Sequence, residues 1–233
     1  MNTGTLGEKL IVDNNKGDYI MEYGIIRMKD VFPRDNDVAK WVVGLAVIYN
    51  DLIFLKKKLF QTSDVISDLI SEAPSILKIL ISSLREAIFY LEESEKSVQI
   101  RSYINSLPEH LIQMHMSLKL LFRNGEKADL LQKFSNTRNI TYHYSKPQKN
   151  ELSEALEALS NEIIFYDERD QKFLFAEHVR NTILLISLFS SNEIKLEQEL
   201  PISEIIISIK ETIETFIDFS NKVSKHYLKD FVK

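Results

Sequence analysis

Residues 76–91 read Ile-Leu-Lys-Ile-Leu-Ile-Ser-Ser-Leu-Arg-Glu-Ala-Ile-Phe-Tyr-Leu, and this stretch decides the fold. Its apolar side chains return every three or four positions, which is the spacing of one face of an α-helix. The stripe consists of Leu77, Leu80, Ile81, Leu84, Ile88 and Leu91. Proline is favoured in a first helical turn, so we predict a helix from about Pro74 to about Ser94 with one face in a core.

The same periodicity recurs on both sides of this stretch. It predicts a long helix from Asp37 to about Gln61 that packs antiparallel to the first. Ser106 and Glu109 have the spacing of a capping box and predict a helix that runs to about residue 124 and is ended by Gly125. Further helices are predicted at residues 126–144, from residue 150 onward, at 171–190 and at 201–229. A hairpin of residues 163–166 and 173–175 is the alternative to the start of the helix at 171–190.

These patterns predict an all-α protein of about seven helices, preceded by an arm. Residues 1–36 hold four of the six glycines and lack helical periodicity, and residues 19–26 are apolar enough for an extended segment or a short strand. With 233 residues, of which 44% are hydrophobic, the chain can bury a sizeable core. The absence of cysteine excludes disulfides, thiolate nucleophiles and cysteine-based zinc sites.

Localisation is also an expectation from the sequence. The chain begins without a basic segment followed by an apolar core, and we find no apolar run of the ~18 to 20 residues that a membrane span requires. We therefore expect a cytoplasmic protein. The chain has 29 basic and 34 acidic residues, and this acidic balance argues against indiscriminate DNA coating.

The segment with the clearest chemical potential is Arg138-Asn139-Ile140-Thr141-Tyr142-His143. On a helix, Asn139 and His143 share a face, so the amide can orient the imidazole. Arg138 and His143 lie about 140° apart around the axis, so a regular helix does not aim both at one phosphate. Either the long arginine side chain curls back, or the working site combines groups from two chains.

These residue types permit phosphodiester chemistry without a metal or cofactor. Histidine can accept the proton of a ribose 2′-hydroxyl or protonate the leaving 5′-oxygen, which contributes ~10² to 10⁴ in rate. A guanidinium can hold the scissile phosphate and stabilise its developing charge. We therefore assign His143 as general acid/base, Arg138 as phosphate ligand and Asn139 as the residue that positions the imidazole.

The surroundings of this segment are basic. Residues 119–149 contain seven basic and two acidic residues, a surplus of five, whereas the whole chain stands at −5 and the remainder therefore at −10. Such asymmetry suits a polyanion-binding face. As substrate-binding residues we predict Lys133, Lys146 and Lys149, together with Tyr144, whose ring is placed to stack on a base.

In this form the motif resembles the signature of the HEPN superfamily, small all-helical dimers many of which cut RNA. The resemblance covers residues 37–165, with residues 166–233 as a helical extension on the same core. It implies a homodimer with a composite site, a metal-independent endoribonuclease that leaves a 2′,3′-cyclic phosphate, and a toxin or phage-defence role restrained by an inhibitory or activating partner protein. The alternative is a catalytically inactive helical module that binds RNA, a nucleotide or a protein.

Several other polar residues are weaker candidates for a functional role. Arg180-Asn181 repeats two letters of the motif without a histidine. His110 and His115 are five apart rather than the four that a helical zinc pair needs, so no metal site is predicted. Two polar pairs, Asn50-Asp51 and Arg85-Glu86, interrupt apolar helices. They suit a solvated edge or an internal ion pair, although an acidic residue in the second position could steer Arg138.

Overall fold

The computed structural model describes residues 9–12, 21–24, 27–60, 66–142, 150–161, 173–189 and 200–231. Within these ranges a two-stranded antiparallel hairpin precedes nine helices. The strands are β1 (Lys9–Val12) and β2 (Met21–Gly24). The helices are α1 (Met28–Val31), α2 (Asp37–Phe60), α3 (Ile66–Ser94), α4 (Val98–Ser106), α5 (Glu109–Lys119), α6 (Ala128–Tyr142), α7 (Asn150–Ala158), α8 (Leu174–Leu188) and α9 (Leu200–Leu228).

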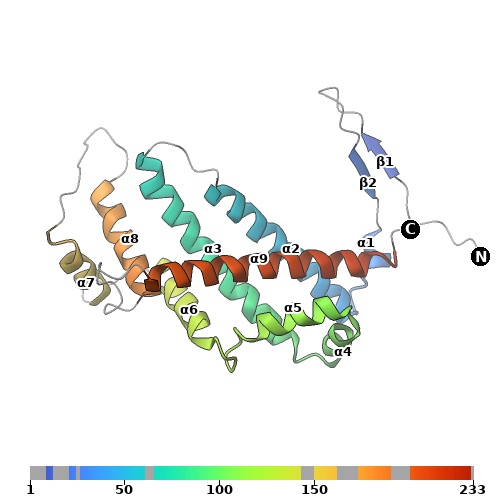
Figure 1. Cartoon of the computed structure of the whole chain (residues 1–233). Helices are drawn as coiled ribbons and strands as arrows, with labels where there is room; N and C mark the ends of the chain where they lie inside the picture. Colours follow the sequence, from blue (N-terminus) through green and yellow to red (C-terminus); the bar gives the residue numbers. More distant parts are fainter. Residues whose placement is uncertain are drawn as a thin grey trace, which may run out of the picture.

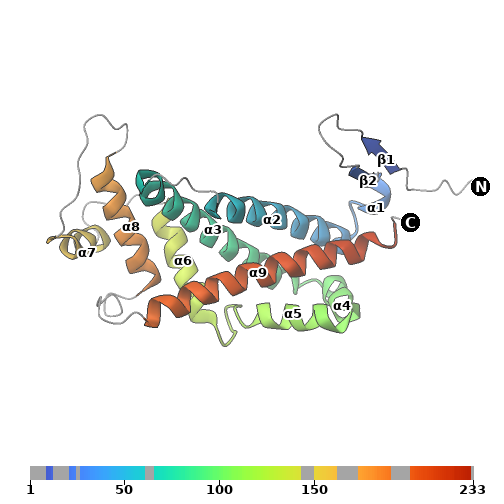
Figure 2. The ribbon, with the colours of Figure 1, turned by 45° about the horizontal axis from the view of Figure 1, so that its top comes forward.

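α9 runs along α2 and α5, and α7 and α8 lie beyond its N-terminal end (Figure 1). α2 packs on α9 and on α3, and α5 packs on α9 from another side (Figure 2). α6 lies against α3 and α8, and α7 contacts α8. The all-α prediction for the body of the chain is therefore confirmed, and α2 and α3 are antiparallel neighbours as predicted.

One continuous core joins α2, α3 and α9. Its largest fully buried side chains include Trp41, Leu45, Leu84, Phe134, Phe216 and Phe219. The stripe read from residues 76–91 is buried from Leu80 to Leu91, as its spacing predicts. Burial of each large apolar side chain stabilises the fold by about 1.5–3 kcal/mol.

Val31 and Phe32, at the end of α1, contact the C-terminal end of α9. The Tyr227 hydroxyl donates a hydrogen bond to the Val31 carbonyl over 2.8 Å, and the Phe32 ring stacks on Tyr227 with centroids 5.6 Å apart. Val31 is 1% exposed. Part of the predicted arm thus belongs to the core, whereas β2 confirms the short strand expected within residues 19–26.

Two predicted helix starts are wrong. α3 begins at Ile66 and continues for 29 residues, so Pro74 lies in its interior, where proline lacks the amide for a helical hydrogen bond, and not in its first turn. The capping box does not form, because Ser106 ends α4 and its hydroxyl donates to the Tyr103 carbonyl over 2.7 Å. α5 follows with Pro108 at its N-cap and without a side-chain cap.

The nine-residue helix α4 was missed from the sequence. It is capped by Ser97, whose hydroxyl oxygen accepts a hydrogen bond from the Ile100 amide over 3.5 Å. It buries only Ile100 and Ile104, which is one turn of apolar spacing. The remaining helix predictions agree with α2, α6, α7, α8 and α9, and α8 replaces the alternative hairpin from Leu174 onward.

α5 ends at Lys119, and a turn that depends on Gly125 leads into α6. The Lys127 amide donates to the Leu120 carbonyl over 2.7 Å, and the Gly125 amide donates to the Phe122 carbonyl over 2.7 Å. A Cβ added at Gly125 would lie 2.3 Å from the Leu120 carbonyl oxygen. The contacted atom is backbone, so the turn itself must move to accept any side chain.

We therefore expect Gly125→Ala to lower the free energy of unfolding by about 2 kcal/mol, since the turn must open and lose a hydrogen bond. Urea denaturation of both proteins measures the difference. Asn124→Ala, at the exposed neighbouring position, is the matched control and should change stability by less than about 0.5 kcal/mol. Equal stability of Gly125→Ala and the parent chain would contradict this turn geometry.

α2 is the one helix in the described ranges that is long and apolar enough to cross a membrane, with a mean hydropathy of 1.7. This corrects the expectation that no segment meets that criterion. Core helices of globular proteins also meet it, and α2 buries Trp41, Leu45 and Leu52 against its neighbours. Its outer face carries the exposed side chains of Val47 and Phe54.

Candidate functional site at the α3–α6 contact

The first five residues of the predicted catalytic segment lie on α6. Arg138 through Tyr142 are helical, as the reading of the motif required. His143, Tyr144, Lys146 and Lys149 fall outside the described residues, so their predicted roles stay predictions. Lys133 lies one and a half turns before Arg138 on the same helix and is partly buried.

Buried residues at helical spacing fix the orientation of α6. Leu130, Leu131, Phe134 and Thr137 are each 8% exposed or less. The Thr137 hydroxyl lies 3.1 Å from the Ser187 hydroxyl of α8, so α6 is joined to α8 by a partly buried hydrogen bond. With that face in the core, Asn139 is exposed and the Arg138 side chain is 40% exposed at the surface.

α3 supplies an acidic neighbour for Arg138. Nε of Arg138 lies 3.6 Å from Oε1 of Glu86, whose side chain is 57% exposed. Glu86 also pairs with Arg85, and Nε of Arg85 donates to the Ser135 hydroxyl over 2.9 Å. An ion pair this exposed adds at most about 1 kcal/mol of stability, so its main effect is to restrict where the guanidinium lies.

This contact agrees with the predicted possibility that an acidic residue on α3 steers Arg138. The interruption Arg85-Glu86 is an ion pair, as also expected, and it reaches α6. The Arg85 guanidinium lies 4.2 Å from the centre of the Phe89 ring one turn along the same helix, a cation–π contact, while its hydrogen bond to Ser135 reaches α6.

Carboxylates at the C-terminal end of α3 and directly after it pair with basic residues at the end of α5 and beyond it. The Arg123 guanidinium pairs with Glu92 over 2.8 Å and with Glu93 over 2.7 Å. Lys119 pairs with Glu95 over 2.8 Å. The basic surplus counted along the sequence is therefore reduced in space, because its partners come from a helix about 30 residues away.

Hydrogen bonds shift the pKa values of Glu93 and Arg123 in opposite directions. Hydrogen bonds from Lys96 and then Arg123 lower the pKa of Glu93. Hydrogen bonds to Glu92 and Glu93 raise the pKa of Arg123. Both groups stay charged across the physiological range.

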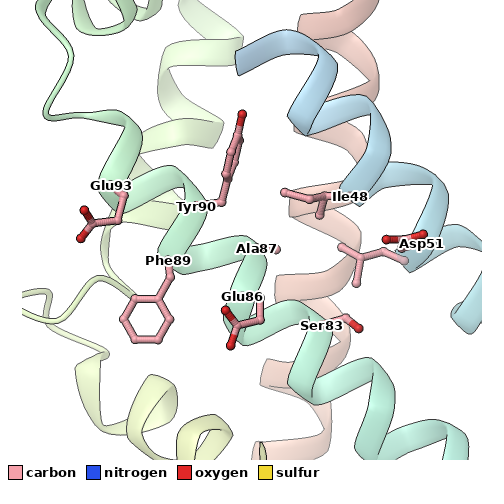
Figure 3. A pocket seen from close by; sticks show the side chains of 9 residues that line it. Ile48, Asp51, Ser83, Glu86, Ala87, Phe89, Tyr90 and Glu93 are labelled. Atoms are coloured by element: carbon pink, nitrogen blue, oxygen red, sulfur yellow. The ribbon is translucent and has the colours of Figure 1, made fainter. Parts of the chain in front are cut away.

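A groove of about 480 Å³ lies between α2 and α3, next to this network (Figure 3). Ile48 and Asp51 of α2 lie opposite Ser83, Ala87 and Tyr90 of α3. Leu52, Glu86, Phe89 and Glu93 complete the lining. The groove is therefore mostly apolar and carries three carboxylates, of which Glu86 also contacts Arg138.

A glycine sets the close approach of the two groove helices. The Tyr90 hydroxyl donates to the Trp41 carbonyl over 3.1 Å, and a Cβ on Gly44 would lie 2.1 Å from the Tyr90 hydroxyl oxygen. Only a residue without a side chain leaves room for the ring across α2. The signal in the sequence was a glycine within a strongly helical pattern.

Two other polar residues noted in the sequence, Arg180 and His115, contact neighbouring residues of the fold. Arg180 pairs with Glu177 on α8. The pKa of Lys78 is lowered mainly by burial of its side chain and secondly by the positive charge of Arg180. His115 is 3% exposed and packs on Phe219 with centroids 5.7 Å apart. No group of three or more potential metal ligands occurs in the part of the chain that the structure describes.

Sequence reasoning missed the groove and the network around Arg123. In the sequence, Asp51 stands out only as an interruption of an apolar helix. Comparison with protein-family models, with curated proteins and with solved structures finds no match to the chain.

Proposed function

We propose that the chain is a cytoplasmic, metal-independent endoribonuclease of HEPN type that acts as a homodimer. Cleavage proceeds by attack of the ribose 2′-oxygen on the adjacent phosphorus, expulsion of the 5′-oxygen and formation of a 2′,3′-cyclic phosphate. The proposed biological role is that of a toxin or phage-defence effector controlled by a partner protein.

The single observation that carries the proposal is the placement of Arg138. It lies on the exposed side of a helix whose other side is fixed in the core, and Glu86 of a second helix restrains its guanidinium at 3.6 Å. A permanently charged, positioned donor is what stabilisation of a pentacoordinate phosphate requires. Asn139, the next residue on the same helix, is exposed beside it.

His143 enters the proposal from the sequence alone. As general base it takes the 2′-hydroxyl proton, and as general acid it delivers a proton to the 5′-oxygen. In a dimer the two steps are divided between the histidines of the two chains, and the 140° between Arg138 and His143 on one helix is then no obstacle. Lys133, Lys146, Lys149 and Tyr144 are the proposed RNA-binding residues.

The second candidate is a catalytically inactive module that binds a protein or RNA. The observation that favours it is the pairing of Lys119, Arg123 and Arg138 with the carboxylates of Glu95, Glu92 and Glu86, on α3 or directly after it. Cations already paired in this way release fewer counterions from RNA, which weakens electrostatic binding.

Cleavage of a structured RNA in EDTA tests the proposal. We expect wild type to produce fragments ending in cyclic phosphate, and His143→Ala to cleave at least about a hundredfold more slowly. Arg138→Lys should also lose most activity, because an ammonium cannot bind a phosphate through two parallel hydrogen bonds.

His110→Ala is the matched control, since His110 is an exposed histidine of α5 outside the motif. It should cleave like wild type, and identical purification of all four proteins controls for contaminating nucleases. Equal cleavage by wild type and His143→Ala, or no cleavage by a folded dimeric wild type, would reject the enzyme in favour of the binding module.

A further inference from the structure

We propose that the groove between α2 and α3 docks an amphipathic helix of a partner protein whose apolar face is flanked by lysine or arginine. The proposal concerns binding at the groove and holds whether or not the chain cleaves RNA.

The floor of the groove is apolar and long enough for side chains of a helix. Ile48, Leu52, Ala87 and Phe89 line it. Along α3 the lining runs from Ser83 to Glu93, ten positions that span roughly 15 Å, or nearly three helical turns. A partner helix seated along that length presents apolar side chains at positions i, i+3, i+4 and i+7.

The exposed face of α2 extends the apolar surface beyond the groove. Val47 and Phe54 lie on either side of Asp51 at helical spacing, and their exposures are 54% and 59%. These side chains gain from burial only if another molecule covers them. Phe54 is the larger and is the natural anchor of such a contact.

Charge selects the kind of partner. Asp51, Glu86 and Glu93 give the groove three carboxylates and no lining cation. Glu86 already pairs with Arg85 and Arg138, and Glu93 pairs with Lys96 and Arg123, so Asp51 supplies the charge that remains for a partner. Asp51 forms no ion pair within the described part of the chain, so its charge is available to a partner cation. Phosphate-bearing partners and anionic lipid surfaces are disfavoured by the charge of Asp51, whereas lysine and arginine side chains are favoured.

A partner bound in this groove also affects Arg138 on the surface of α6. Glu86 lines the groove and lies 3.6 Å from Arg138. A cation of the partner that approaches Glu86 competes with Arg138 for the same carboxylate oxygens. Occupation of the groove thus changes the position of Arg138 without contact between the partner and α6.

Fluorescence anisotropy with a designed probe tests the docking. The probe is a fluorescein-labelled peptide of about 14 residues, built from leucine and lysine at helical spacing and roughly 21 Å long as a helix. A second peptide carries glutamate in place of every lysine. We expect the lysine peptide to bind wild type, and the glutamate peptide to bind at least tenfold more weakly.

Two variants and one matched control locate the binding site. Asp51→Lys and Phe54→Ser change exposed positions of α2 and should each weaken binding at least tenfold in folded protein, verified by circular dichroism. Glu157→Lys, at an exposed position of α7, makes the same change in net charge as Asp51→Lys and should leave binding unchanged.

Three results would overturn the proposal. Equal loss of binding in Asp51→Lys and Glu157→Lys would show non-specific attraction to an acidic protein. No binding of the lysine peptide to wild type would exclude this class of partner. Sedimentation of wild type as a dimer and of Phe54→Ser as a monomer would assign the surface to a second copy of the chain instead.

Discussion

Phe134→Ala should lower the free energy of unfolding by about 3–5 kcal/mol, the range for loss of a fully buried phenylalanine. Phe134 is 0% exposed and lies in the core on the inner side of α6, one turn before Arg138. Its removal leaves a cavity beneath the helix that carries Arg138 and Asn139. Most globular domains are stable by only about 5–15 kcal/mol, so the variant should approach the limit of folding.

Urea denaturation followed by circular dichroism measures this effect. Phe134→Leu keeps most of the volume and should lose less than half as much stability. Gln132→Ala, at an exposed position of the same helix, is the matched control and should stay within about 0.5 kcal/mol of wild type. A Phe134→Ala variant as stable as Gln132→Ala would contradict the packing of α6.

Acid should destabilise the protein through His115, which is the second large effect. Burial lowers the pKa of His115 to about 4, the Glu95 carboxylate 3.6 Å away opposes that shift, and Lys119 adds to it. The unfolded chain binds this proton below about pH 6.5, whereas the folded chain binds it only near pH 4. The stability from neutral His115 is therefore complete above pH 6.5 and is lost as the pH falls toward 4.

We expect wild type to lose about 2 to 3 kcal/mol more than His115→Gln between pH 7.5 and pH 4.5, since each pKa unit corresponds to about 1.4 kcal/mol. Subtracting the unfolding free energies of the two proteins cancels the contribution of the carboxylates that titrate in the same pH range. Urea unfolding at several pH values gives both curves. Parallel curves for wild type and His115→Gln would refute the assignment.

The long helices could be predicted from the sequence because their apolar spacing continues over many turns. The stripe of residues 76–91 and the pattern from Asp37 onward both correspond to buried faces of α3 and α2. Short elements could not be predicted in the same way. α4 buries only two isoleucines, which is too few to form a periodic pattern. Ser106 does not cap the next helix because its hydroxyl donates a hydrogen bond inside α4.

The candidate site was predictable only where it is local in sequence. Arg138 and Asn139 belong to the motif, and α6 places both at the surface. The partners of the basic segment were not predictable, because Glu92 and Glu93 reach Arg123 from about 30 residues away. Ion pairing across that distance depends on the packing of α3, which no local pattern contains.

The central position of α9 determines when this protein can finish folding during synthesis. Its side chains Phe216, Phe219 and Val223 fill the core beside α2, and Tyr227 bonds to Val31 across 196 residues. The helices made early therefore keep exposed apolar faces until about residue 228 has left the ribosome. At typical rates of about 5–20 residues per second, α2 waits roughly 10 to 35 seconds for its partner, an interval in which chaperone binding to the nascent chain is expected.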